Sequence, residues 1–337
     1  MVVYIILILI LFGGLIAGYV HFFGPRKANN QAGQGDGDAP QKDPVQAELA
    51  EERIRFRLDV AYASSDNSRQ RLDIFRPIKP HADKLPVVVF FHGGGWTEGD
   101  KKDGLPHLLP LVRSGRYIGV SVEYRTVKEA VWPAQLYDCK AAIRWIREHA
   151  EDLGMDPQRI AVWGQETGAY LALMLGLTGD RHGLEGGLGA HRHVSSKVAA
   201  VVNYAGVTDL AALLGQSGAD ERISLEAKML GRELTENETQ LSIASPVTHV
   251  SAQSPPVLTV HGTEDPVVPY AQAVCLDKAL IEAGRPSYLI PVKGAGHGEF
   301  PAQVDSRTRN FLDRFLLDLE QEIETDELYV DAFNRMA

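Results

Sequence analysis

One stretch, Arg159 to Leu175, constrains the fold of this 337-residue chain more than any other. It opens with a short apolar run that has the length and composition of a buried strand. The turn from Gly164 to Gly168 follows, and an apolar segment of helical length comes directly after it. A strand that enters a helix through so tight a turn projects the central side chain of the turn at the end of the strand. That side chain is Glu166, and it is expected at the edge of a sheet covered by helices.

Strands and helices alternate through the rest of the chain. Alternating apolar residues at 54–62 predict a half-exposed antiparallel strand, with 71–75 as its partner. Continuous apolar runs predict buried strands at 87–91, 117–124, 198–204, 257–260 and 288–292. Helices are predicted at 133–153, 270–283 and 302–322, and a polar lid at 215–250. This order indicates a mostly parallel sheet with helices on both faces, and functional residues at the carboxyl ends of its strands.

Composition divides the chain into four parts. Residues 2–23 contain no Asp, Glu, Lys or Arg, and as a helix they are long enough to cross a bilayer core of about 30 Å. We predict a single transmembrane anchor rather than a cleaved signal peptide, because a basic start and a clear cleavage site are missing. The predicted parts are the anchor at 1–23, a flexible linker at 24–50, a globular domain at 51–322 and an acidic tail at 323–337.

Charge and composition exclude several classes of function. The net charge of −10 and the lack of Lys/Arg clusters argue against a nucleic-acid partner. Arg26 and Lys27 directly follow the predicted anchor and favour a cytoplasmic side for the domain.

Cys139 and Cys275 fall in predicted helices, so no disulfide framework is expected. The histidines of the 179–197 loop lack the spacing of a metal site, and we expect neither a metal nor a cofactor. The sequence does not predict the oligomeric state.

Four loops that each follow a predicted strand carry chemically useful residues. They are His-Gly-Gly-Gly-Trp at 92–96, the turn with Glu166, the loop with Asp265 and the loop with His297. Any one of these patterns is weak, because His-Gly-Gly runs and Gly-His-Gly turns occur by chance. Together they place an apex residue, then an acid, then a histidine in the chain order of the α/β-hydrolases.

From about residue 55 to 320 the chain resembles the acetyl esterase/lipase group of the α/β-hydrolase superfamily, which includes bifunctional feruloyl and acetyl-xylan esterases. The resemblance is carried by the segments PAQLYDCKAAIRWIREHAEDLGMDPQRIAVWG, VVNYAGVTDL and PPVLTVHGTEDPVVP. It implies an α/β-hydrolase fold and a Ser-His-Asp esterase ancestry. By position, His297 is the implied general base and Asp265 the acid that orients it. Glu264 fits less well, because the acid of the family precedes a proline.

The resemblance also assigns the remaining residues of the site. Backbone N–H groups of Gly94, Gly95 and Thr167 are implied to form an oxyanion hole, and Trp96 is expected to line the substrate pocket. The chain departs from the family at one position, because Glu166 stands where the nucleophilic serine belongs.

Three interpretations of Glu166 stay open. In the first, its carboxylate is the nucleophile of a hydrolase that acts on a small ester-like or strained electrophile, since attack on an ordinary acyl ester would give an anhydride. In the second, the carboxylate fills the oxyanion hole, and the chain is an inactive esterase-like pseudoenzyme that serves as a binding or scaffold module. In the third, Glu166 is a general base that activates water directly.

Overall fold

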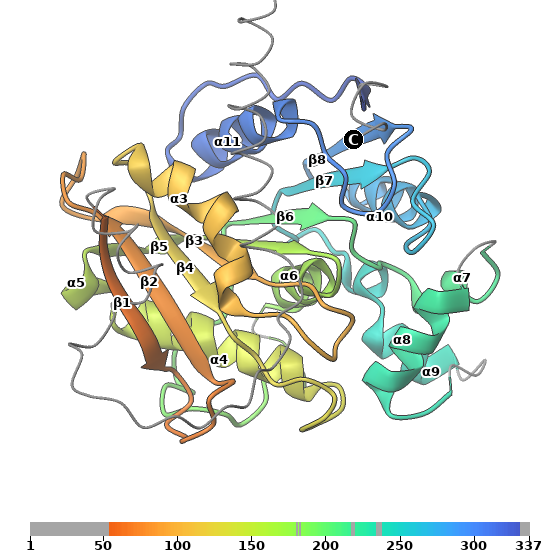
Figure 1. Ribbon diagram of the computed structural model, residues 1–337, viewed down its shortest axis with the longest axis horizontal. Helices are drawn as coiled ribbons and strands as arrows, with labels where there is room; N and C mark the ends of the chain where they lie inside the picture. Colours follow the sequence, from red (N-terminus) through yellow and green to blue (C-terminus); the bar gives the residue numbers. More distant parts are fainter. Residues whose placement is uncertain (1–53, 180, 182, 217–219, 234–237, 331–337) are drawn as a thin grey trace, which may run out of the picture. The chain divides into compact units, whose positions relative to one another are not determined.

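A computed structural model of the chain describes residues 54–179, 181, 183–216, 220–233 and 238–330, and these residues build a nine-stranded sheet between helices (Figure 1). The predicted anchor at 1–23 and linker at 24–50 lie outside the described residues and stay predictions. Within the described ranges no helix has the length and apolar character needed to cross a membrane.

The sheet is mostly parallel, as predicted. Its strands lie in the order β1-β2-β4-β3-β5-β6-β7-β8-β9. β2 pairs antiparallel with both β1 and β4, and every other neighbouring pair is parallel. The strands are β1 (Ile54–Ala61), β2 (Arg71–Pro77), β3 (Leu85–Phe91), β4 (Ile118–Val122), β5 (Met155–Gln165), β6 (Ala200–Tyr204), β7 (Val257–Gly262), β8 (Ser287–Lys293) and β9 (Leu328–Tyr329).

Helices cover both faces of the sheet because side chains of a buried strand alternate between its faces. In β3, Val87 and Val89 join one apolar core, and Val88 and Phe90 join the other. On the side of Val88 the sheet is covered by α3 (Leu105–Arg113) and α11 (Gln303–Leu316) (Figure 1). The opposite side is covered by α4 (Ala134–Glu148), α5 (Ala150–Leu153), α6 (Thr167–Thr178) and α10 (Ala271–Glu282).

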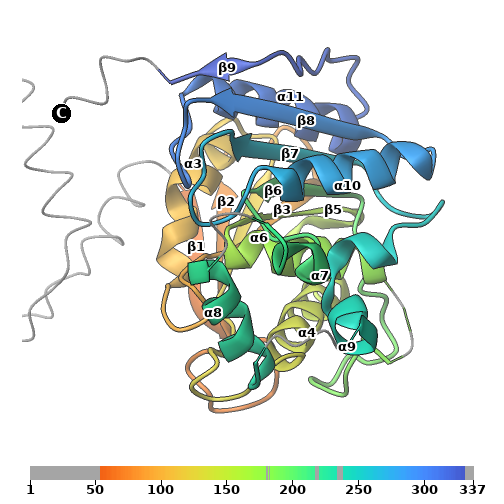
Figure 2. The ribbon, with the colours of Figure 1, turned by 90° about the vertical axis from the view of Figure 1, so that its right-hand side faces the viewer.

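The segment predicted as a polar lid contains short helices. α7 (Leu210–Leu213), α8 (Asp220–Leu230) and α9 (Glu238–Ala244) are grouped on one side of the domain, at the right of Figure 1 and facing the viewer in Figure 2. The 3-10 helix η2 (Pro246–His249) follows them. α8 reaches the loop at 92–96, because a Cβ placed on Gly95 would lie 3.3 Å from Cδ2 of Leu225. A helix of the predicted lid therefore covers this loop. The loop conformation continues beyond residue 96 as far as the 3-10 helix η1 (Lys101–Gly104).

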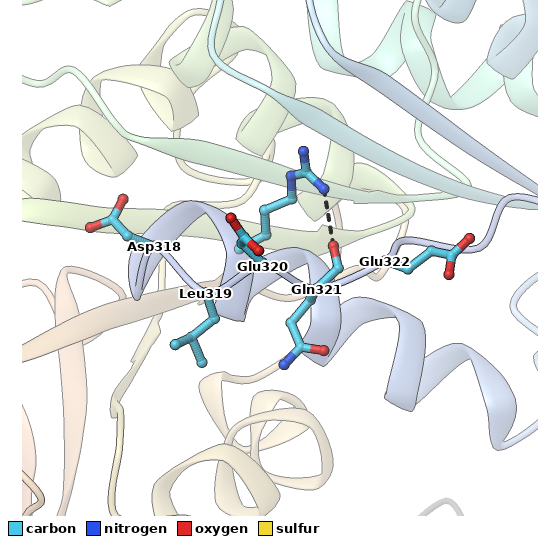
Figure 3. A pocket seen from close by; sticks show the side chains of 6 residues that line it. Asp318, Leu319, Glu320, Gln321 and Glu322 are labelled. Carbon is cyan, nitrogen blue, oxygen red and sulfur yellow. Dashed lines mark hydrogen bonds between the residues drawn. The ribbon is translucent and has the colours of Figure 1, made fainter.

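The chain after α11 returns across that helix and adds β9 to the edge of the sheet. Arg307 of α11 donates to the carbonyl and carboxylate oxygens of Asp326, both at 2.6 Å. Figure 3 shows the side chains of 318–322, which line a surface cavity of about 540 Å³, with Arg314 bonded to the carbonyl of Gln321. β9 belongs to the segment set apart in the sequence as an acidic tail, 323–337, so the sheet extends into that segment.

His107 of α3 lies among aromatic rings. Its ring stacks on Phe90 with centroids 5.0 Å apart, and its centroid is 4.8 Å from that of Trp163. Burial lowers the pKa of His107 to about 4, although the side chain of Gln165 opposes the shift. The unfolded chain takes up this proton near the ordinary histidine value of about 6.5 and the folded chain only near 4. Stability is therefore lost as the pH falls between these two values.

We expect His107→Phe to remove this acid sensitivity while keeping the stacked ring. Through His107 alone, the free energy of unfolding of the wild type should fall by up to about 3 kcal/mol between about pH 7 and pH 4. Urea denaturation at the two pH values measures the difference. His193→Gln, at an exposed histidine, is the control and should follow the wild type. An unchanged pH dependence in His107→Phe would contradict the assignment.

Candidate active site

Glu166 stands at the apex of the turn between β5 and α6. Its backbone has φ 56° and ψ −117°, a left-handed conformation that strains any residue other than glycine. Its amide donates to the carbonyl oxygen of Tyr204 at 2.8 Å. A Cβ on Gly164 would lie 2.1 Å from the carbonyl oxygen of Gly168, and a Cβ on Gly168 would lie 2.0 Å from that of Phe91. The turn is therefore packed directly on β3, and only glycine fits on both sides of the apex.

The carboxylate of Glu166 lies against the loop at 92–96. Its Oε2 accepts hydrogen bonds from the amides of Gly94 at 2.6 Å and Gly95 at 3.1 Å. The hydroxyl of Thr167 donates to the same oxygen at 3.2 Å, and the role of the Thr167 amide in an oxyanion hole stays a prediction. The N-terminus of α6 adds a favourable dipole for this negative charge. The amides assigned to an oxyanion hole thus converge on an oxygen of the protein itself.

Trp96, which the sequence placed in a substrate pocket, is buried. Its side chain is 1 % exposed, and its ring packs edge-to-face on Tyr170 of α6 with centroids 5.2 Å apart. Its carbonyl oxygen accepts a hydrogen bond from the amide of Val127 at 2.9 Å. The residue supports the loop from the core side, and its contact with substrate stays a prediction.

Asp265 and His297 are paired, as the resemblance implied. Nδ1 of His297 lies 2.7 Å from Oδ2 of Asp265, and Oδ1 accepts from the amides of Val267 at 2.8 Å and Val268 at 2.9 Å. Burial alone would raise the pKa of Asp265, but the bond and charge of His297 and the two amides outweigh it, so the pKa lies below its ordinary value. Asp265 is therefore a stable anion that orients His297.

The loop of His297 passes beside the turn of Glu166. A Cβ placed on Gly298 would lie 2.9 Å from Nε2 of Gln165, the residue that precedes Glu166. The structure therefore brings the turn of Glu166 and the loop of His297 together at the carboxyl ends of β5 and β8. In the described part of the chain, no three metal-ligating side chains converge.

Sequence analysis missed His261, which lies behind the acid. Its Nε2 is 2.8 Å from the carbonyl oxygen of Val268 and 3.5 Å from Oδ2 of Asp265. Burial lowers the pKa of His261, against the opposing effects of that carbonyl and of Asp265, so the ring is neutral and donates to Val268. The only signal in the sequence is that His261 lies at the end of a buried strand, just before the loop that carries Asp265.

Comparison with known protein families gives two matches. The family described as BD-FAE matches residues 72–280, and the family described as TAP-like protein matches residues 237–326.

Curated relatives include two esterases of Mycobacterium tuberculosis. Esterase LipQ is 31 % identical over 242 residues, which is 71 % of this chain and 56 % of the relative. Esterase LipC is 31 % identical over 267 residues, which is 77 % of this chain and 64 % of the relative. The chain thus spans only about half to two thirds of the length of these relatives.

Solved structures with a similar fold include esterases. A truncated form of a carbohydrate esterase from gut microbiota has a TM-score of 0.73 at 27 % identity, over 79 % of this chain and 98 % of that one. Esterase 2 of Thermogutta terrifontis, phosphonylated by sarin, has a TM-score of 0.65 at 28 % identity, over 79 % of this chain and 96 % of that one.

Proposed function

The chain belongs to the BD-FAE family of α/β-hydrolases, and from this premise we propose that it is a hydrolase of carboxylesterase ancestry whose nucleophile is the carboxylate of Glu166. The substrate is a small molecule with an ester-like or strained electrophilic carbon. The proposal is carried by one observation: Oε2 of Glu166 is held by the amides of Gly94 and Gly95. If an ester formed on the Glu166 carboxyl group were hydrolysed, the negative charge would develop on the oxygen that these amides hold.

The reaction has two steps. In the first, Oε1 of Glu166 attacks a saturated carbon of the substrate, the bond from that carbon to its leaving group (an oxygen or a halide) breaks, and the leaving group takes the electron pair. This step leaves an alkyl ester on Glu166. In the second, His297 takes a proton from water, and the hydroxide attacks the carbonyl carbon of that ester. Collapse of the tetrahedral intermediate releases the alcohol with the proton from His297 and leaves a carboxylic acid on Glu166. The remaining proton of the water passes from this acid to the leaving-group anion of the first step or, where that anion is a halide, to solvent, which restores the carboxylate.

The oxyanion hole thus serves the enzyme's own carboxyl group. During the second step the negative charge of the tetrahedral intermediate lies on Oε2, which already faces both amides. Each such donor stabilises an oxyanion by about 3 kcal/mol. Asp265 keeps His297 oriented and stabilises the imidazolium that forms. An acyl ester fits poorly, because its carbonyl oxygen needs the position that Oε2 occupies.

The same contact favours a second candidate function. A carboxylate bonded to two amides and a hydroxyl at a helix N-terminus is a stable arrangement, and it blocks the hole against a substrate carbonyl. In this alternative the chain keeps the esterase fold as a binding or scaffold module without turnover.

The test is a panel of epoxides, haloalkanes and aryl acetates, followed by a single turnover in ¹⁸O-labelled water. If Glu166 is the nucleophile, the label enters the Glu166 carboxyl and the first product is unlabelled. If Glu166 is a general base, the product carries the label. We expect His297→Ala to accumulate the alkyl ester on Glu166, visible as a mass increase in the peptide that contains it. Glu166→Gln should lack the adduct, and Glu264→Gln, at an exposed carboxylate, should not change turnover. A wild type inert towards the whole panel favours the scaffold.

The proposal includes membrane attachment through residues 1–23, which is supported by the uncharged run at 2–23. Arg26 and Lys27 favour a cytoplasmic domain. Extraction of the membranes at alkaline pH tests the anchor, because a protein that is lost from the membrane there has no such anchor. Protease accessibility of the domain in sealed membrane vesicles tests on which side the domain lies.

A further inference from the structure

The loop at 92–101 is held from beneath by Glu123, the residue that follows β4 and is 6 % exposed. Its Oε2 accepts a hydrogen bond from the amide of Lys101 at 2.8 Å. Its Oε1 lies 3.8 Å from Nε2 of His92. His92 begins the loop and Lys101 ends it, so one carboxylate bonds the end of the loop and lies beside the ring at its start.

Arg69 connects the same carboxylate to the middle of the loop. Its Nη1 pairs with Oε1 of Glu123 and also donates to the carbonyl oxygen of Gly99 at 3.2 Å. Gly99 packs against the start of the loop, because a Cβ on it would lie 2.2 Å from Nδ1 of His92. The loop backbone is therefore fastened at two points, Gly99 and Lys101, to one ion pair whose carboxylate is buried.

His92 connects this ion pair to the amides that hold Glu166. Its Nδ1 lies 2.6 Å from the carbonyl oxygen of Gly93, the group that shares a peptide bond with the amide of Gly94. Its ring stacks on Tyr124 with centroids 4.3 Å apart, and the Tyr124 hydroxyl donates to the carbonyl oxygen of His92 at 2.6 Å. The orientation of the Gly93–Gly94 peptide therefore depends on how His92 is held.

Charge on Glu123 is sensitive to pH. Burial raises its pKa to about 7, against the opposing effects of the Lys101 amide and of Arg69, while Asp100 adds to the rise. Other charged groups lie near the loop. The Lys101 ammonium forms ion pairs with Asp59 and Asp73, and Asp103 is close enough to His92 to affect its pKa. Burial lowers the pKa of His92, so this ring stays neutral when Glu123 titrates.

We propose that Glu123 is a positioning residue: its ionised carboxylate holds the Lys101 end of the loop and, through Arg69, keeps Gly99 against His92, and so directs the amides of Gly94 and Gly95 towards Glu166. The role of these amides in turnover rests on the proposed function. The positioning itself does not, since it concerns a contact within the resting protein.

The test follows amide resonances of the full-length chain labelled with ¹⁵N at glycine and lysine. In the wild type, the Gly94, Gly95 and Lys101 amides are expected to shift together with a midpoint near pH 7, the value at which Glu123 changes charge. In Glu123→Gln this shared titration is expected to be lost. Glu151→Gln, in the exposed pair of Glu151 with Lys84, is the matched control and should keep it.

Two further variants separate the possible failures. In Glu166→Gln the Lys101 titration should persist, which excludes Glu166 as its source. Arg69→Met should move the midpoint to higher pH, because the Arg69 charge lowers the pKa of Glu123, and it carries the test if Glu123→Gln does not fold. The proposal is overturned if the wild type shows no shared titration, if the titration survives in Glu123→Gln, or if the Arg69→Met midpoint does not rise. A wild type without hydrolase activity would overturn the proposed function and leave these expectations unchanged.

Discussion

Glu166→Ser is expected to hydrolyse aryl acetates at least about a hundredfold faster than the wild type, because removal of even one oxyanion donor typically costs 10²–10³ in kcat. In the wild type both amides, of Gly94 and Gly95, are taken by Oε2 of Glu166. Serine is shorter and vacates that position, so the carbonyl oxygen of an ester can enter it. The hydroxyl then stands at the apex of the turn, next to the loop that carries the His297–Asp265 pair. Steady-state kinetics with p-nitrophenyl acetate measures the gain.

Two further variants show where such a gain comes from. Glu166→Ala empties the hole without supplying a nucleophile, and it should gain much less than Glu166→Ser. The double variant Glu166→Ser with His297→Ala should lose the gain, because the serine then has no base. A folded Glu166→Ser that is no faster than the wild type would mean that His297 does not reach the apex.

Gly168→Ala is expected to lower the free energy of unfolding by more than about 3 kcal/mol. Its new Cβ would lie 2.0 Å from the carbonyl oxygen of Phe91 and 2.4 Å from that of His92. Both oxygens belong to the end of β3 and the residue after it, and β3 pairs with β4 and β5 on its two sides, so the backbone has little room to retreat. Urea denaturation monitored by circular dichroism measures the loss.

The matched control is Gly187→Ala. Gly187 lies in a surface loop, and the nearest atom that its new Cβ would meet is Cζ of Arg192 at 4.0 Å. This variant should therefore unfold within about 0.5 kcal/mol of the wild type. Equal stabilities for Gly168→Ala and Gly187→Ala would show that the turn is less tightly packed on β3 than the distances indicate.

Much of the fold could be predicted from local patterns. The uninterrupted apolar run at 87–91 predicted β3, and the alternation at 54–62 predicted β1 as a half-exposed antiparallel strand. α3 was missed because Pro106 and Pro110 lie within it, and proline argues against a helix interior. β9 was missed because two residues carry no periodicity, and the ion pairs that Asp326 and Glu327 make just before it, with Arg307 and Lys293, leave no pattern in the sequence.

The site was predicted as a set of loops but not as a set of contacts. Chain order and the family resemblance together named Glu166, Asp265 and His297. The sequence did not show that the Thr167 hydroxyl bonds the Glu166 carboxylate, because a side-chain conformation cannot be read from a sequence motif. Glu123 and His261 were missed for a different reason. A lone Glu after a strand and a lone His within one are common, and their roles come from partners brought near by folding, such as Arg69 for Glu123.

The two edges of the sheet are protected in different ways against pairing with a strand of another molecule. Within the described residues β1 has a neighbour on one side only, but its pairing register shifts between Arg57 and Val60, and exposed Arg55 and Arg57 lie along it. Such irregular, charged margins discourage a second molecule from adding its own strand. At the other margin β9 covers the end of β8. Copies of this chain are therefore expected to meet, where they meet at all, through helices or loops and not through a continuous intermolecular sheet.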